Sequence, residues 1–269
     1  MGAPIRSIRL LLPLMGAALL LSAQEPGKGK GAAKAWVEHF NAPLDGKKWA
    51  VSEGNAPGYR PGLHLGFYEP DNVGVQDGCL VLGLWQEPGT VDGNPDGTYS
   101  FGSHVATKQK YGYGTYEWRM RMSSTATTPA GAGDPVSGSV SAGFIYVNNS
   151  ETEIDFEFGA QQPDTLVMGN WRNTNPATGP FDEQSTFSAA PLEGISDGFH
   201  TFKFVWQAGS IAYFVDDVLQ AVHTTNVPVA PAPFMINHWG TDNPFWGGLA
   251  TYGVGRRFFV DWVKFTPLP

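Results

Sequence analysis

The sequence has 269 residues, and 17 Lys and Arg against 25 Asp and Glu give a formal net charge of −8 at pH 7. A chain this acidic is poorly suited to a phosphate backbone or an anionic lipid surface, which argues against nucleic-acid and membrane partners. The single cysteine, Cys79, excludes an intrachain disulfide, and we expect it to be a small buried hydrophobe on a strand.

The N-terminal residues 1–23 have the pattern of a signal peptide. Two arginines precede an apolar run at residues 10–21, and the small residues Ser22 and Ala23 follow. The run is too short to span a bilayer, so we expect cleavage after Ala23. The mature protein would then be secreted or periplasmic and would have no membrane partner.

The rest of the chain has the composition of an all-β protein. Gly (34) and Pro (21) are abundant, charged residues make up only 16%, and aromatic residues reach 13%. Sustained helical periodicity is missing, whereas short apolar or alternating runs recur between turn signals. We expect residues 24–34 to form a flexible linker and residues 35–269 to form one domain, a β-sandwich of two antiparallel sheets.

Strand patterns follow one another along this domain. They occur at residues 79–85, 97–109, 113–122, 140–147, 152–158, 201–207, 210–215, 218–222, 234–239 and 257–265. The second and third are predicted to pair with each other, and residues 123–139 are predicted to be a loop. A short turn at Asn148-Asn149-Ser150 and a two-residue link at Asp216-Asp217 predict two hairpins.

The hexapeptide EIDFEF, which begins at Glu153, has an unusual pattern. In a strand, Glu153, Asp155 and Glu157 share one face, although like charges along one ridge repel. The acidic face is therefore either ordinary solvated surface or a site. Phe144 and Tyr146 share a face of the preceding strand and would lie beside the acids. Carboxylates next to aromatic rings favour sugar chemistry, because pyranose faces stack on such rings and glycosidic cleavage needs two carboxyl groups.

EIDFEF resembles the E-[apolar]-D-[apolar]-E signature of the family 16 glycoside hydrolases. The likeness runs from about Val37 to Phe265 and includes KYGYGTYEWRMRM, GSVSAGFIYV, MINHW and VDWVKFT. The resemblance implies a concanavalin A-like jelly roll with a concave substrate cleft, which cleaves β-glucans or related polysaccharides with retention. The five-residue spacing is similar to that of the lichenase and xyloglucan-active branch.

The resemblance also implies a role for each matching residue. Glu153 matches the nucleophile, Asp155 the assisting acid and Glu157 the general acid/base of a catalytic domain. The implied sugar-binding residues are Phe144, Tyr146, Asn170, Trp171, Arg172, Asn237 and Trp239. No cofactor is implied for catalysis, but a structural calcium is, with Asp261 as its carboxylate and Gly78 and His39 as carbonyl donors.

Several departures from the family pattern leave the substrate open. Thr152 replaces an Asp of the lichenase pattern, and residues 103–107 replace a sugar-binding Glu and Arg. The segment 86–100 is expected to remodel one end of the cleft, and His238 is expected beside it. We expect a monomer that hydrolyses β-1,3-1,4- or β-1,3-glucan from within the chain. A transglycosylase of xyloglucan-like glucans and a non-catalytic carbohydrate-binding protein remain alternatives.

Overall fold

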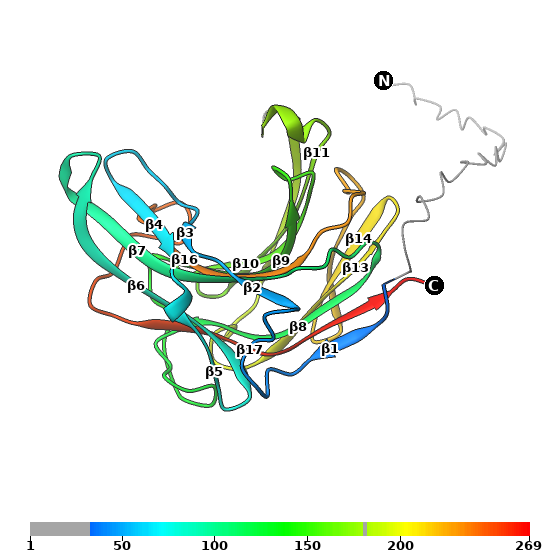
Figure 1. The fold of residues 1–269 in the computed structure, drawn as a ribbon, viewed down its shortest axis with the longest axis horizontal. Helices are drawn as coiled ribbons and strands as arrows, with labels where there is room; N and C mark the ends of the chain where they lie inside the picture. The colour runs from blue at the N-terminus through cyan, green and yellow to red at the C-terminus, as the bar shows by residue number, and fades with distance from the viewer. Residues whose placement is uncertain (1–32, 180–181) are drawn as a thin grey trace, which may run out of the picture. The chain divides into compact units, whose positions relative to one another are not determined.

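The computed structural model describes residues 33–179 and 182–269 (Figure 1). The predicted signal peptide, and all of the predicted linker except residues 33 and 34, lie outside the described residues. Within the described ranges, none of the helices has the length and apolar character needed to cross a membrane.

Nearly every regular element of the described residues is a strand, as the sequence predicts. Two short 3-10 helices, η1 (Pro70–Asn72) and η2 (Pro176–Thr178), are the exceptions. The strands are β1 (Trp36–Glu38), β2 (Trp49–Val51), β3 (Gly54–Asn55), β4 (His64–Tyr68), β5 (Val73–Gln76), β6 (Cys79–Val91), β7 (Asn94–Thr107), β8 (Gly114–Ser124), β9 (Ser139–Val147), β10 (Thr152–Gly159), β11 (Thr165–Asn173), β12 (Glu183–Pro191), β13 (His200–Gln207), β14 (Ser210–Val215), β15 (Val218–His223), β16 (Phe234–Gly240) and β17 (Arg256–Pro267).

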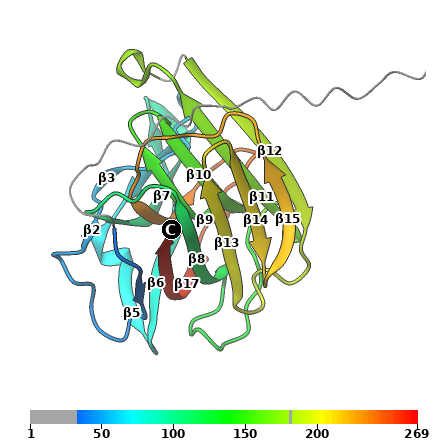
Figure 2. The same ribbon diagram turned by 90° about the vertical axis from the view of Figure 1, so that its right-hand side faces the viewer.

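The strands form two layers that pack face to face. One layer has the pairing order β2-β7-β16-β9-β10-β11-β12, and the other has the order β5-β6-β17-β8-β13-β14-β15, with β1 also paired to β17. Figure 2 shows β13, β14 and β15 side by side in the second layer. These pairs are antiparallel as predicted, but β4 joins β7 in a parallel pair beside the β6–β7 hairpin.

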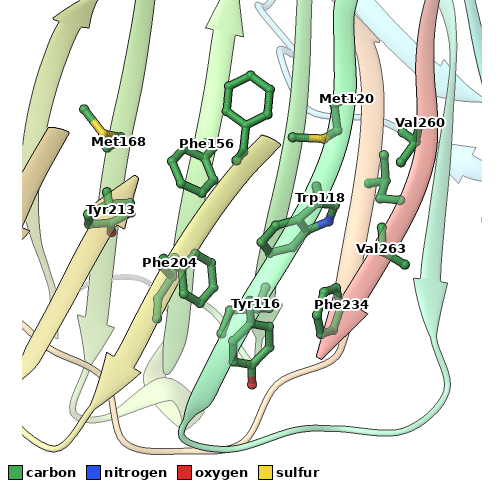
Figure 3. Packing of buried hydrophobic residues seen from close by; sticks show 14 of the residues in the cluster. Tyr116, Trp118, Met120, Phe156, Met168, Phe204, Tyr213, Phe234, Val260 and Val263 are labelled. Carbon is green, nitrogen blue, oxygen red and sulfur yellow. The ribbon is translucent and has the colours of Figure 1, made fainter. Parts of the chain in front are cut away.

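Aromatic side chains from both layers fill the space between them (Figure 3). Phe156 of β10 is fully buried and meets Tyr213 edge-on, with ring centroids 5.5 Å apart. Tyr116 of β8 stacks on Phe204 at 4.8 Å and on Phe234 at 4.7 Å. Burying an aromatic side chain of this size contributes about 1.5–3 kcal/mol, so the core fixes which face of β10 points outward.

Two predicted hairpins are confirmed, and one predicted strand pair is wrong. β14 and β15 flank Asp216-Asp217, and β9 and β10 flank the turn at residues 148–150. Residues 97–109 and 113–122 do not pair, because β7 pairs with β16 in one layer while β8 pairs with β13 in the other. Residues 86–100 belong to the β6–β7 hairpin, whose ladder hydrogen bonds outweigh its Gly- and Pro-rich composition.

Candidate active site

Strand β10 carries the three acids on the outer face of its layer. Glu153 pairs across the sheet with Tyr146 of β9 and with Trp171 of β11. Asp155 pairs with Phe144 of β9, so aromatic rings flank the acids on both sides. Asp155 is only 3% exposed, and Glu153 and Glu157 are half-buried. Because the apolar residues of β10 face the core, the period of two places all three acids on the opposite side.

The acids form part of a cleft of about 780 Å³. Five of the predicted sugar-binding residues also line it: Phe144, Tyr146, Trp171, Asn237 and Trp239. A second hollow of about 480 Å³ continues the cleft over β11 and β12 and shares Glu157, Trp171 and Trp246 with it. The combined groove therefore extends to both sides of the catalytic strand predicted from the sequence.

The surroundings raise the pKa values of all three acids. Burial, opposed by a hydrogen bond from Ser150 and assisted by the charge of Glu183, raises the pKa of Glu153 to about 7. Burial and the charge of Glu153 raise the pKa of Glu157 to about 8. The pKa of Asp155 lies well above its usual value, because of burial and then the charges of both glutamates.

Like charges this close repel, so the three carboxyls cannot all ionise together, and part of the set keeps a proton near neutral pH. A site that holds one ionised and one protonated carboxyl can supply both a nucleophile and a proton donor. The carboxyl of Asp155 lies between the two glutamates, and its Oδ2 has no hydrogen-bond partner among the described residues. A protonated Asp155 could donate a hydrogen bond to either neighbour or to a bound sugar.

Two predicted sugar-binding residues do not lie in the cleft. Asn170 is fully buried, donates to the backbone carbonyls of Thr225 and Asn226 at 3.2 and 2.7 Å, and bonds with His223 at 2.7 Å. Arg172 lies two residues further along β11 and is exposed outside the cleft lining. Side chains of a strand alternate, so the position of Trp171 in the cleft puts both neighbours on the other face.

Several cleft residues were not predicted from the sequence. They are Ser52, Glu53, Asn55, Tyr68, His104, Ala142 and Met235, together with the loop residues Ala56, Pro57 and Trp246. The rings of Tyr68 and His104 stack with centroids 5.2 Å apart, which continues the aromatic lining across β4 and β7. Burial lowers the pKa of His104 to about 4, so this histidine is a neutral ring at physiological pH. The aromatic ring of His104 was the one signal in the sequence that could have indicated a place in the cleft. Its stacking partner, Tyr68, lies 36 positions earlier in the chain, so the contact could not be predicted from either segment alone.

His238 was expected beside the cleft, and this expectation is wrong. Its ring is fully buried between the layers, where it bonds with the backbone carbonyl of Leu82 at 2.9 Å and with the hydroxyl of Ser123 at 2.8 Å. Asn237 and Trp239 line the cleft, so the residue between them must point inward. Segment 86–100 was expected to remodel one end of the cleft. This is not observed, because no residue of the segment lines the cleft.

The residues predicted for a calcium site fit that ion poorly. The carboxylate of Asp261 accepts a hydrogen bond from Nε of Arg119 at 2.9 Å, so a cation already neutralises it. Gly78 lies in the β5–β6 turn with a φ of +76°, and His39 follows β1. Among the described residues, no cluster of three or more His, Cys, Asp or Glu side chains could hold a metal ion.

A β-sandwich whose outer sheet face sets crowded acids among aromatic rings defines a carbohydrate-active protein. The family model of the glycosyl hydrolases family 16 matches residues 66–264, and the chain belongs to this family. The chain is 30% identical to a beta-glucanase of Acetivibrio thermocellus over 208 residues, which are 74% of this chain and 54% of that protein. It is 34% identical to a beta-glucanase of Paenibacillus macerans over 163 residues, 58% of this chain and 60% of that protein.

The chain thus spans little more than half the length of these relatives. Among solved structures, the Bacillus licheniformis beta-glucanase superposes with a TM-score of 0.70 at 23% identity, covering 88% of this chain and 100% of that one. A lichenase derived from a mouse hindgut metagenome gives a TM-score of 0.68 at 24% identity, with coverage of 88% and 100%. This likeness identifies the fold as the predicted jelly roll.

Proposed function

We propose that this protein is an endo-acting, retaining hydrolase of neutral β-glucans with β-1,3-1,4 or β-1,3 linkages. The observation that carries the proposal is the alignment of Glu153, Asp155 and Glu157 on one face of β10, inside an aromatic cleft. The names of the curated relatives agree with β-glucan as the substrate.

Two displacement steps account for the roles of the two glutamates. In the first step, Glu153 attacks the anomeric carbon while Glu157 gives its proton to the departing glycosidic oxygen. A glycosyl ester on Glu153 results, and the leaving chain departs as a neutral alcohol. In the second step, Glu157 removes a proton from water, which displaces the ester and restores both side chains with retained configuration.

The charge of the groove supports a neutral polymer. Neither the cleft nor its continuation over β11 and β12 is lined by a Lys or Arg residue of the described chain. Glu53 adds a fourth acid to the cleft. Sulfated galactans and uronic-acid polymers would be repelled, because no cation is available to pair with their charges.

The shape of the groove supports attack within a chain. Its walls reach from residues 52–57 on one side of β10 to Phe187 and Ala189 of β12 on the other. Sugar units can therefore be bound on both sides of the scissile bond, with Trp171 and Trp246 as stacking surfaces.

A panel of polysaccharides tests this proposal. Barley β-glucan, laminarin, xyloglucan and carrageenan would be incubated with the protein and with Glu153→Ala, and reducing ends and viscosity would be followed. We expect viscosity of a neutral β-glucan to fall faster than reducing ends appear, and no such change with the variant. Oligosaccharides longer than the input would identify a transglycosylase instead. Binding without turnover would identify a carbohydrate-binding protein.

Export is proposed on the sequence alone. The arginines, apolar run and small residues within 1–23 support it. Mass spectrometry of the protein from a bacterial periplasm or medium should give a mature N-terminus at Gln24. An intact leader in the cytoplasmic fraction would contradict the proposal.

A further inference from the structure

The turn that joins β9 to β10 has an uncommon backbone conformation. Asn148, Asn149 and Ser150 have φ values of 47°, 50° and 58°, so three consecutive residues other than glycine are left-handed. Asparagine tolerates this region better than serine does. Strain of this kind persists where the surrounding structure enforces it, and it often marks a functional constraint.

Hydrogen bonds with the end of β11 and the segment that follows it hold this turn in place. The side-chain amide of Asn173, which is 2% exposed, donates to the carbonyl of Asn149 at 2.8 Å. The backbone N–H of Asn173 donates to the carbonyl of Ser150 at 2.7 Å. The amide of Asn149 donates to the carbonyl of Pro176 at 2.9 Å. Both backbone carbonyls and a side-chain amide of the turn are therefore hydrogen-bonded to residues 173–176.

The result is that Ser150 points at the proposed nucleophile. Ser150 is 6% exposed, and its hydroxyl donates a hydrogen bond to Oε2 of Glu153 at 2.5 Å. Asn148 instead donates to the carboxylate of Glu151 at 2.9 Å. Among the described residues, Ser150 is the one side chain that donates a hydrogen bond to Glu153.

We propose that Ser150 is a positioning residue for Glu153, which orients the carboxylate through Oε2 and leaves Oε1 free to attack the anomeric carbon. This inference rests on the proposed function, since it concerns the nucleophile of that reaction. The same bond favours the ionised form of Glu153, because a hydroxyl can stabilise a carboxylate by donating to it.

The other groups that face Glu153 do not help it to ionise. Asp155 and Glu157 lie on the same strand, Tyr146 faces it from β9, and Glu183 acts on it from β12. Each is an acid, and each carboxylate raises the pKa of its neighbours when it is charged. Burial and charge repulsion both raise the pKa of Glu153, and the hydrogen bond from Ser150 opposes both effects.

Four variants separate positioning from turn structure. Ser150→Thr keeps the hydroxyl but puts a β-branched residue at a positive φ, which lowers stability. Ser150→Gly removes the hydroxyl and relieves the backbone strain. Ser150→Ala removes the hydroxyl with little other change. Ser210→Ala, in the β13–β14 hairpin where Ser210 accepts from Gln207 at 2.9 Å, is the matched control outside the cleft.

The measurement is kcat/KM against pH with a dinitrophenyl β-glucan disaccharide, whose leaving group needs no proton from Glu157. The acidic limb should move up by roughly one pH unit in Ser150→Ala and Ser150→Gly, which is about a tenfold loss of kcat/KM below the limb. Ser150→Thr and Ser210→Ala should keep the wild-type limb. If Ser150→Gly keeps that limb, or Ser150→Thr loses it, the hydroxyl does not position Glu153 and the inference is wrong.

A second readout does not depend on turnover. The Glu153 carboxyl carbon would be followed by NMR during a pH titration of the wild type and of Ser150→Ala. A higher pKa of Glu153 in the variant supports the inference, and an unchanged pKa overturns it. If the wild type is inactive on every glucan, the proposed function fails, while this titration still decides whether Ser150 holds the carboxylate.

Discussion

The two faces of strand β10 are both largely withdrawn from solvent, but with opposite consequences. Ile154, Phe156 and Phe158 are fully buried in the core, where loss of contact with water stabilises the fold. Asp155, on the other face, is 3% exposed, and its burial raises its pKa instead. Burial therefore stabilises the fold through the apolar side chains, whereas it makes the charged form of the acidic side chains unfavourable.

This difference shows how the sandwich supports its site. A strand has a period of two, so six consecutive residues can contribute alternately to the core and to the cleft. The apolar face fixes β10 against the second layer, and the acidic face then points into the aromatic cleft. We expect variants of the acidic face to change activity, and variants of the apolar face to change the stability of the fold.

The largest effect is expected from the acidic face. Glu153→Ala should lower kcat on β-glucan by about 10⁴-fold, because the covalent route is lost. Glu157→Ala should lower it by about 10²- to 10⁴-fold on β-glucan, and far less on a dinitrophenyl glycoside, whose leaving group needs no proton. Steady-state kinetics with both substrates measures this contrast. A Glu153→Ala protein that keeps more than about a tenth of the activity would contradict the assignment.

The apolar face should respond in stability. Phe156→Ala removes a ring that contacts Tyr213 and Phe202 at centroid distances of 5.5 Å, and it should lower the free energy of unfolding by about 3–5 kcal/mol. Ile154→Val, which removes one methyl group, should cost about 0.5–1.5 kcal/mol. Denaturant titrations measure both values. Equal losses from the two variants would show that the core around Phe156 is not tightly packed.

The acidic face should weaken the fold as pH rises. Below pH 4.5 the Glu157 carboxyl keeps its proton in the folded and unfolded states alike, so it has little effect. Between the usual pKa and about 8, the folded state holds a proton that the unfolded state has lost, and the free energy of unfolding falls. Glu157→Gln cannot titrate, so it should stabilise the protein at pH 8 by at least about 1 kcal/mol and change little at pH 4.

Denaturation of Glu157→Gln at both pH values checks this expectation. Glu87→Gln, on β6 outside the cleft, is the control and should behave like the wild type at each pH. A Glu157→Gln protein that is less stable than the wild type at pH 8 would mean that the carboxylate is compensated in the folded state.

The smallest effect is expected from metal removal. Because Arg119 neutralises Asp261, addition of EDTA or of calcium should leave the Tm of the wild type unchanged. Thermal denaturation in both conditions measures this. A fall of more than about 2 °C with EDTA would indicate a bound ion that contributes to stability.

The sequence predicted those features that depend on local periodicity. Alternation in EIDFEF assigned each residue of β10 to its face, and Asp216-Asp217 located the β14–β15 hairpin. Trp171 lies in the cleft as predicted, whereas Asn170 does not. Successive side chains of a strand point to opposite faces, so the alternation along β11 would have shown that these two neighbours cannot both face the cleft.

Features that depend on distant pairing could not be predicted in this way. Tyr68 and His104 meet only because β4 and β7 pair in parallel, a register that neither segment encodes alone. Residues 86–100 look like a loop, and they form strands because β6 and β7 satisfy each other's backbone groups. The contact of Ser150 with Glu153 likewise depends on the left-handed turn, which its sequence permits but does not require.

Covalent trapping tests the central claim most directly. A 2-deoxy-2-fluoro glycosyl fluoride of the preferred glucan would form the glycosyl ester and slow its hydrolysis, and peptide mass spectrometry would locate the sugar. Our account predicts one sugar adduct, on the peptide that contains Glu153 and at that side chain. An adduct on Asp155 or Glu157, or hydrolysis with inversion and without any adduct, would contradict it.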